Sequence, residues 1–275
     1  RGWGVRMGLR CSTRCPTGES ENLVSGPRCW ATTCADRAVY RGEWRGQHRH
    51  GHGKQLWDDG SSYVGQWKDD LPHGRGRLEH ADGDVYEGDW EEGLAHGSGE
   101  YTLLDGSRYT GRWSRDTREG FGVETWPDGA KYSGEYLAGK KSGHGAICWA
   151  DGATHEGQFL DDALNGEGFH TWPDGRTYQG EWVANRMNGY GVATWADGRR
   201  YEGQYRLDVK EGVGVFTWPD GQKYDGEWKC GLRHGVGTVT TSAGVCYRSR
   251  WAEGREVEVI DDAPKSAGEA LAGYE

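Results

Sequence analysis

The sequence predicts an all-β fold, an elongated, twisted, single-layer antiparallel array of β-hairpins. Three observations predict it. A pattern of 23 residues recurs nine times without insertion or deletion. Glycine and aromatic residues alternate at fixed positions within each copy. Only 34% of the chain is apolar, yet it contains 15 Trp, 14 Tyr and 48 Gly. A fixed short period is typical of repeat arrays, and burial by rings rather than by Leu or Ile favours a thin, strand-rich structure.

The opening residues of each copy form its first expected strand. The copies open at Tyr40, Tyr63, Tyr86, Tyr109, Tyr132, His155, Tyr178, Tyr201 and Tyr224. With this residue as position 0, position 2 is Gly and position 4 is aromatic in every copy. These three positions share one face of a strand, because side chains alternate along it. A glycine between two rings leaves a notch in which a neighbouring ring can settle, so we expect the rings to interlock from copy to copy.

A second strand is expected over positions 11 to 17, which begin with two glycines and often end in Trp. The segment Trp172–Gly175 illustrates the expected turn, since Pro fixes one φ, Asp bonds its own backbone and Gly accepts a positive φ. Each copy is then a hairpin that cannot fold alone, and successive hairpins pair into an antiparallel meander.

The array also predicts the domain organisation. We expect a loose leader containing Arg and Cys at residues 1–39 with a half-hairpin cap over 29–39, nine repeats at 40–246, a degenerate tenth half-repeat at 247–257, and an acidic tail or cap at 258–275. In the tenth copy Ser249 replaces the glycine. A short helix over 265–274 is expected to cover the last strand, because exposed edges need protection. Since the chain begins at Arg1 rather than Met, we expect it to be a fragment or the product of an incomplete gene prediction.

The charge balance is acidic. The formal net charge is −10, and residues 40–251 carry −8 of it. Without a basic stripe to displace phosphate counterions, nucleic acid is not an expected partner, and contact with an anionic membrane is disfavoured. The odd count of seven cysteines favours a reducing compartment, the cytoplasm.

The unit Tyr-x-Gly-x-Trp-x-x-Gly-x-x-His-Gly-x-Gly is intact over Tyr86–Gly99 and Tyr224–Gly237. It resembles the MORN repeat (membrane occupation and recognition nexus), and the resemblance covers residues 40–251. This resemblance implies a twisted antiparallel sheet and a role as a scaffold in cytoskeletal, ciliary or membrane-junction assemblies, or as the regulatory part of a larger enzyme. The sixth copy departs most from the family, since His155 and Phe159 replace the usual Tyr and Trp.

Contact residues for a partner are expected at position 17 and at the ring pair of the seventh copy. They are Trp57, Trp126, Trp149, Trp172, Trp195 and Trp218, together with Tyr178 and Trp182. A row of rings in a groove can bind a protein segment, or its rings can stack only on one another, and the sequence leaves both open. Acidic residues at position 3, such as Glu135 and Glu181, are expected on the opposite face as solvated or cross-strand paired groups rather than as acid–base catalysts.

Motifs near the N-terminus allow other chemistry. Residues 7–12 fit a myristoylation pattern, with Gly8 and Cys11 as acylation sites if Met7 is the initiator. Two pairs of cysteines within residues 11–34 could hold zinc, and the H-x-H-x-H run of residues 48–52 could hold a metal. His50 is simply the usual residue at position 10 of its repeat, and these cysteines lie in the loose leader. We therefore expect no metal and no cofactor.

We therefore expect a non-enzymatic cytoplasmic scaffold, associated with the cytoskeleton or with membranes. It should bind a basic or amphipathic segment of a partner protein along an aromatic groove with an acidic rim. No P-loop, nucleophile elbow, kinase signature or dinucleotide fingerprint occurs in the sequence. Two alternatives stay open. One is a regulatory fragment of a phosphatidylinositol phosphate kinase or a SET-type methyltransferase, and the other is a phosphoinositide- or membrane-binding module.

Overall fold

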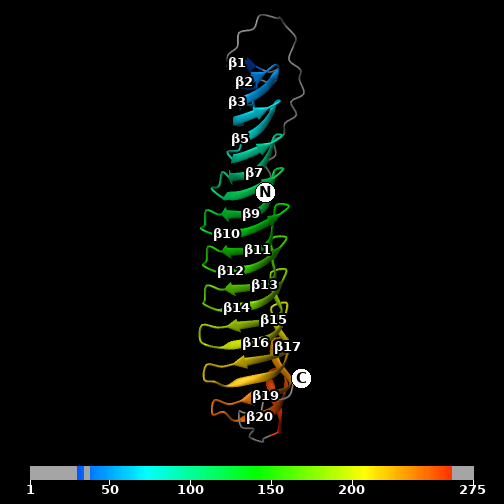
Figure 1. Cartoon of the computed structure of the whole chain (residues 1–275). Coiled ribbons are helices and arrows are strands. Elements are labelled where there is room, and N and C mark those ends of the chain that lie inside the picture. The colour runs from blue at the N-terminus through cyan, green and yellow to red at the C-terminus, as the bar shows by residue number, and fades with distance from the viewer. Residues whose placement is uncertain (1–29, 34–37, 262–275) are drawn as a thin grey trace, which may run out of the picture. The chain divides into compact units, whose positions relative to one another are not determined.

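The computed structural model describes residues 30–33 and 38–261, and every regular element in these ranges is a β-strand. The chain divides into two compact units, residues 1–140 and 141–275. Within each unit the strands pair antiparallel in chain order and form a single layer (Figure 1). This confirms the predicted all-β array of hairpins.

Each repeat supplies a strand of seven residues, at positions −1 to 5, and one of nine, at positions 8 to 16. Over residues 30–137 the strands are β1 (Trp30–Thr33), β2 (Val39–Arg45), β3 (His48–Leu56), β4 (Ser62–Lys68), β5 (Leu71–Glu79), β6 (Val85–Glu91), β7 (Leu94–Thr102), β8 (Arg108–Ser114), β9 (Thr117–Thr125) and β10 (Lys131–Leu137). Over residues 140–261 they are β11 (Lys140–Cys148), β12 (Thr154–Leu160), β13 (Ala163–Thr171), β14 (Thr177–Val183), β15 (Arg186–Thr194), β16 (Arg200–Arg206), β17 (Val209–Thr217), β18 (Lys223–Lys229), β19 (Leu232–Thr240), β20 (Cys246–Ala252) and β21 (Arg255–Asp261).

Two kinds of turn connect these strands. The predicted turn is present: Trp172 donates its N–H to the Arg176 carbonyl at 2.9 Å, and Gly175 has a φ of 80°. A second, two-residue turn lies at positions 6 and 7, where Ala184 and Asn185 have φ values of 48° and 66°. Positive φ at both residues defines a type I′ turn, which matches the twist of the strands it joins. The sequence does not signal this turn, because Ala184 is not a usual residue for a positive φ.

The predicted glycine notch is filled by the ring that opens the same copy. Gly180 on β14 lies opposite Gly191 on β15, and a Cβ on Gly191 would overlap the Tyr178 phenol. Under this strand, Tyr178 donates its hydroxyl to the Glu181 carbonyl at 3.1 Å. Every copy that opens with Tyr has this bond from position 0 to the carbonyl of position 3, at 2.9–3.1 Å. The glycines therefore let a buried ring pass beneath its own hairpin.

The buried rings form a spine within each unit. In the first unit, Tyr63 packs edge-to-face on Trp67 of its own copy and on Trp90 of the next, with centroids 5.0 and 5.4 Å apart. In the second, Tyr201 packs in the same way on Tyr205 and Trp228, at 5.1 and 5.2 Å. Such pairs each stabilise a fold by about 0.5–1.5 kcal/mol beyond the area they bury. The predicted interlocking of rings from copy to copy is confirmed.

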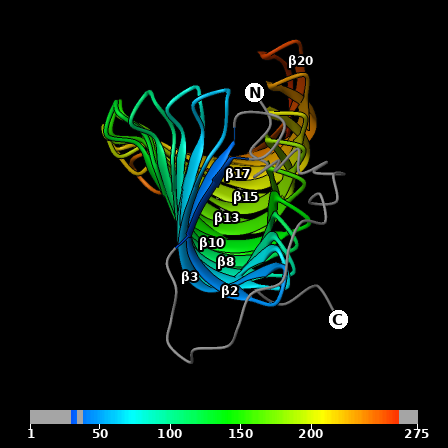
Figure 2. The ribbon, with the colours of Figure 1, turned by 90° about the horizontal axis from the view of Figure 1, so that it is seen from above.

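Each nine-residue strand bends at position 11, where glycine has a positive φ, for example 64° at Gly189. The bend takes the next N–H out of the ladder, and in seven copies a Glu, Gln or Asp side chain at position 3 accepts it. Glu181 accepts from Tyr190 at 3.0 Å, and Gln204 accepts from Val213 at 3.0 Å. The acids at position 3 thus point away from the rings, as expected, but they also cap the backbone. The curvature of the strands is visible in end view (Figure 2).

Side chains at the two-residue turns tie each copy to its neighbour. In most ties an Asp or Asn at position 7 accepts the N–H of position 9 in the preceding copy, as Asn185 does from Leu164 at 2.7 Å. Where position 7 is Gly231, Glu211 at position 10 of the preceding copy accepts the N–H of Cys230 instead, at 2.9 Å. Position 10 is His in the intact repeat unit. Where it is Glu, as at Glu211, the carboxylate supplies an acceptor that a glycine at position 7 cannot provide.

The ends of the array differ from the regular copies. β1 pairs antiparallel with β2 at the N-terminal end. In β20, Ser249 replaces the glycine and its hydroxyl oxygen accepts the Trp251 indole N–H at 2.7 Å. Residues 258–261, expected to start a loose tail, instead continue β21 and pair with β20. Val259 and Ile260 are adjacent β-branched residues between two acids, and β-branched side chains favour a strand over a loose tail. The expected helix over 265–274 lies outside the described residues.

Candidate functional site

The side chains of each unit fall on two faces. The ring face carries positions 0, 4, 9 and 15, and the outer face carries positions 1, 3, 12 and 14. The ring face is filled by its own side chains: Tyr178 is 0% exposed and Trp182 is 4% exposed. The prediction that these two residues contact a partner is therefore wrong. They belong to the spine, whose burial leaves no surface for another molecule.

The six tryptophans at position 17 lie in the wide turns at one margin of the ring face, and all are half-buried. We call the four in the second unit the Trp row: Trp149, Trp172, Trp195 and Trp218. Trp57 and Trp126 hold the same repeat position in the first unit. In the Trp row, two pairs of rings each enclose a ring at position 15, whereas Ala193 holds that position between Trp172 and Trp195. His170 lies between Trp149 and Trp172, at 5.4 and 4.3 Å, and Phe216 lies between Trp195 and Trp218, at 5.9 and 4.6 Å. The rings thus stack on neighbours while keeping part of their surface in solvent.

Both cations and acids lie near this row. The Arg176 guanidinium is 4.1 Å from the Trp172 ring, and Lys210 Nζ is 5.1 Å from the Trp195 ring. Burial lowers the pKa of Lys210 to about 8. Each turn of the row also has an Asp at position 19, which accepts an N–H of its own turn, as Asp174 does from Arg176 at 3.0 Å. The acids at position 3, such as Glu181, point to the outer face, and the expected acidic rim stays a prediction.

Position 9 is a functional feature of the ring face that sequence reasoning missed. In the fourth copy Arg118 is buried and pairs with the buried Glu124, with Nη1 3.2 Å from Oε1. The same carboxylate accepts the Tyr136 hydroxyl at 2.9 Å, and burial raises the pKa of that tyrosine. Position 9 varies among Arg, Lys, Pro, Ala, Leu and Met, so it carries no repeat signal. The only available signal was an Arg and a Glu six residues apart around the bend.

The sixth copy holds a cluster of buried polar atoms without hydrogen-bond partners. His155 is 1% exposed and both of its ring nitrogens are unpaired, as are His170 Nδ1 and Trp182 Nε1. Burial lowers the pKa of His155 to about 4 and also lowers the pKa of His170. Both rings are therefore neutral at physiological pH, and this copy is the least satisfied part of the second unit.

Other predicted sites do not assemble in the described residues. The histidines of residues 48–52 lie against three different carboxylates, those of Asp70, Asp69 and Glu43, with Nδ1 to oxygen distances of 2.6, 3.7 and 3.6 Å. Over residues 30–33 and 38–261, no three His, Cys, Asp or Glu side chains form a metal-binding group. Gly8 and Cys11 lie outside the described residues. In the part that is described, no helix is long and apolar enough to cross a bilayer.

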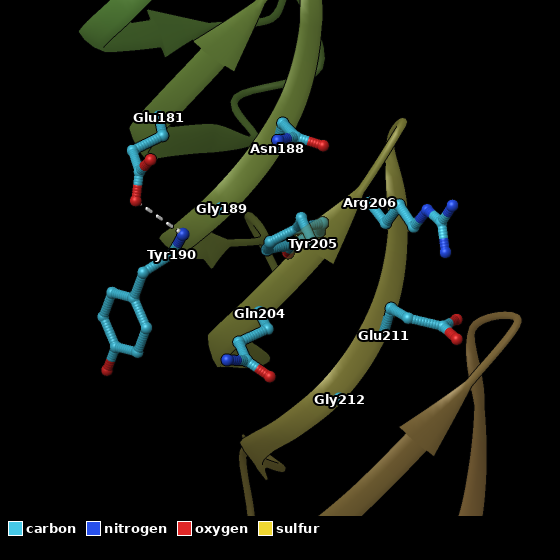
Figure 3. Close-up of a pocket in the computed structure, with 9 residues that line it drawn as sticks. All are labelled: Glu181, Asn188, Gly189, Tyr190, Gln204, Tyr205, Arg206, Glu211 and Gly212. Carbon is cyan, nitrogen blue, oxygen red and sulfur yellow. Dashed lines mark hydrogen bonds between the residues drawn. The ribbon is translucent and has the colours of Figure 1, made fainter.

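Each unit has a shallow hollow on its outer face. In the second unit a space of about 530 Å³ is lined by Glu181, Asn188, Gly189, Tyr190, Gln204, Tyr205, Arg206, Glu211 and Gly212. The Tyr190 ring and the Glu181 carboxylate both project from the sheet beside it (Figure 3). In the first unit a space of about 460 Å³ is lined by Arg75, Gly76, Arg77, Glu87, Gly88 and Glu100.

The MORN repeat family model matches nine successive segments, residues 40–62, 63–85, 86–108, 109–131, 132–154, 155–175, 178–199, 201–223 and 224–245. The chain belongs to the MORN-repeat family. No curated protein matches it.

Similar solved structures include TCP10-type domains. The TCP10 domain of Danio rerio CPAP, in complex with a STIL peptide, is 10% identical with a TM-score of 0.45, over 85% of this chain and 99% of that one. The TCP domain of Drosophila melanogaster SAS-4, in complex with a proline-rich motif of Ana2, is 12% identical with a TM-score of 0.29, over 78% of this chain and 98% of that one. Because both TM-scores are below 0.5, the fold assignment depends on the strand pairing and the family match.

Proposed function

We propose that this MORN-repeat chain is a non-enzymatic scaffold that binds a segment of a partner protein along its Trp row. The observation that carries the proposal is that all four tryptophans in the row are only partly buried and keep some surface in solvent. Indole rings that are held in place by stacking and still reach solvent are the side chains most often found at the energetic centres of protein interfaces. Their orientation is fixed before binding, so little side-chain entropy is lost when a partner docks.

The ionisable groups of the ring face support a structural rather than a catalytic role. Arg118 and Glu124 pair with each other under the sheet, and His155 is enclosed by rings. Such groups cannot reach a substrate, whereas a catalytic acid or base must touch the reacting atoms. The free thiols of Cys148, Cys230 and Cys246 support a cytoplasmic location, where cysteines stay reduced.

Proximity labelling in the native cell tests the proposal. We compare the wild-type chain with a triple variant, Trp172→Ala, Trp195→Ala and Trp218→Ala, and with Phe121→Ala, which removes an exposed ring from the outer face of the first unit. Circular dichroism confirms that each variant is folded. We expect the triple variant alone to lose specific labelled neighbours. If the three proteins label the same set, the Trp row is not the contact surface and the proposal fails.

A further inference from the structure

The outer face of the second unit combines acidic and apolar side chains in a way the rest of the chain does not. We define it by positions 1, 3, 12 and 14 of the sixth to ninth copies, which lie on β12–β19. These sixteen positions hold six carboxylates, six apolar or aromatic side chains and no Lys or Arg. They are Glu156, Gln158, Glu167, Phe169, Gln179, Glu181, Tyr190, Val192, Glu202, Gln204, Val213, Val215, Asp225, Glu227, Val236 and Thr238. The flanking positions −1 and 5 of the same strands add Arg200, Arg206, Lys223 and Lys229 at the margins of the face.

The same sixteen positions in the first four copies have a different character. They hold five Lys or Arg residues against four carboxylates, and only three apolar side chains, Val64, Phe121 and Val123. The repeat framework is the same in both units, so the framework does not require an acidic outer face. The chain therefore contains its own control surface, with equal spacing and nearly balanced charge.

Carboxylates and apolar groups alternate across the strands of this face. Phe169 pairs in register with Glu156 on one side, and Val215 pairs with Glu202 and with Asp225. Phe169 is 45% exposed, Tyr190 is 52% exposed and Val213 is 59% exposed. Adjacent strands lie about 4.8 Å apart, so the face presents apolar and anionic groups in turn along one direction. Such a mixed row is unusual for a merely solvated surface, because its apolar part gains nothing from water.

Two carboxylates on this face are held opposite each other. Glu167 on β13 and Glu181 on β14 are directly paired in register, and like charges in that arrangement destabilise a sheet. Glu181 cannot turn away without releasing the Tyr190 N–H that it caps at 3.0 Å. Among the described residues only Glu202 of the six carboxylates has an ion pair, with Arg200 at 2.6 Å. A cation from outside the chain would relieve the repulsion that the fold imposes.

We propose that the outer face of the second unit docks a basic amphipathic helix of a partner protein, with the helix lying across the strands. One turn of a helix rises about 5.4 Å, close to the strand spacing, so successive turns can address successive strands. Its Lys and Arg side chains pair with the carboxylates, and its apolar side chains cover Phe169, Tyr190 and Val213. The open hollow beside Glu181 and Tyr190 leaves room for such side chains (Figure 3). This deepens the scaffold function proposed above but uses a different surface from the Trp row.

A synthetic Lys/Leu amphipathic peptide of about 18 residues, or five turns, is the probe. We measure its binding to the full chain by fluorescence anisotropy at low and at physiological salt. We expect binding that weakens as salt rises, because exposed ion pairs are screened. A charge-reversed Glu/Leu peptide is expected not to bind. Equal binding of the two peptides, or no binding of the Lys/Leu peptide, overturns the proposal.

Matched variants locate the site. Glu167→Gln with Glu181→Gln removes two charges while keeping the backbone cap, since Gln204 caps in the same way. We expect this double substitution to weaken peptide binding roughly tenfold, because two exposed ion pairs with the peptide are lost. Glu87→Gln with Glu100→Gln makes the same charge change on the first unit and should alter binding less than about twofold. Equal losses from both pairs would show a general charge effect and refute the assigned face.

Two further outcomes separate this inference from the scaffold proposal. The triple Trp-row variant should bind the Lys/Leu peptide as the wild type does, so a failure of the Trp row in cells leaves this inference standing, and the reverse also holds. If the face instead pairs with a second copy of the chain, the wild type will sediment as a dimer, the Glu167→Gln, Glu181→Gln variant as a monomer, and neither will bind the peptide. That result overturns the proposal.

Discussion

The sixth copy offers a sharp test of how the ring spine is stabilised. In the eight copies that open with Tyr, the tyrosine hydroxyl donates to the backbone carbonyl of position 3. His155 replaces this tyrosine in the sixth copy, and both nitrogens of its ring are unpaired. The change His155→Tyr should restore that bond, here to the carbonyl of Gln158. The flanking rings leave the usual room, since Phe159 and Trp182 lie 5.7 and 5.3 Å from the imidazole centroid.

The expected gain can be worked out from the groups involved. A new hydrogen bond adds about 1 kcal/mol net, and removing unpaired buried nitrogens relieves about another 1–3 kcal/mol. We therefore expect His155→Tyr to raise the free energy of unfolding by about 2–4 kcal/mol at neutral pH. For a domain of this size, each kcal/mol shifts the melting temperature by about 2–4 °C.

Acidity should enlarge this gain. Burial holds the pKa of His155 at about 4 in the folded chain, against 6.5 in the unfolded chain. The unfolded state therefore binds a proton first as pH falls below 6.5, and the wild type loses stability until the pH passes about 4. At a pH of about 4.5 this loss amounts to about 2 kcal/mol, because each unit of pKa difference corresponds to about 1.4 kcal/mol. Tyrosine does not titrate in this range, so the variant escapes the loss.

Urea unfolding followed by tryptophan fluorescence, at neutral pH and at about pH 4.5, measures both effects. The reverse change Tyr178→His in the seventh copy is the control, and it should destabilise the chain and make it more sensitive to acid. If His155→Tyr lowers stability at neutral pH, or if its advantage does not grow on acidification, the account of the spine given above is incorrect.

Three other substitutions probe the same framework by thermal melting. Gly180→Val should cost several kcal/mol, because its Cβ would meet the Gly191 backbone at 2.5 Å, whereas Glu135→Gln should cost less than about 0.5 kcal/mol, since the Glu135 side chain is exposed. Equal costs would contradict the assignment of faces. Glu124→Ala should cost about 3–5 kcal/mol, because Arg118 is left buried without its carboxylate, and a cost typical of a surface change would contradict that burial. Trp228→Phe should cost about 1–2 kcal/mol through loss of the indole bond to the Gly214 carbonyl at 2.9 Å, and a neutral result would show that this bond contributes nothing.

Much of the fold could be predicted because the features that build it recur. Rings at positions 0 and 4 and glycines at positions 2 and 13 have one physical use in alternating strands, so their period predicted the hairpins, the wide turn and the buried spine. The type I′ turn was missed, because its positive φ values fall on residues such as Ala184 and Leu207. Those conformations are imposed by the two paired strands and by the ties to the next copy, not by local preference.

The site was harder to predict, because it depends on contacts between unlike residues. Trp172, Trp195 and Trp218 could be identified from period and chemistry, and the structure shows them half-buried. Tyr178 and Trp182 could not serve as contacts once the spine they belong to was closed. The cations near the Trp row come from variable positions, such as Lys210 at position 9 and Arg176 at position 21, so the repeat pattern does not signal them.

The two kinds of tie between turns make the copies less interchangeable than their common length suggests. Leu164 needs the Asn185 side chain that follows it, whereas Glu211 needs the N–H that precedes Gly231. Transplanting a single 23-residue module to another place in the array would mismatch donors and acceptors at both joints. Engineered or evolutionary shuffling should therefore succeed when modules move as adjacent pairs whose shared joint stays intact.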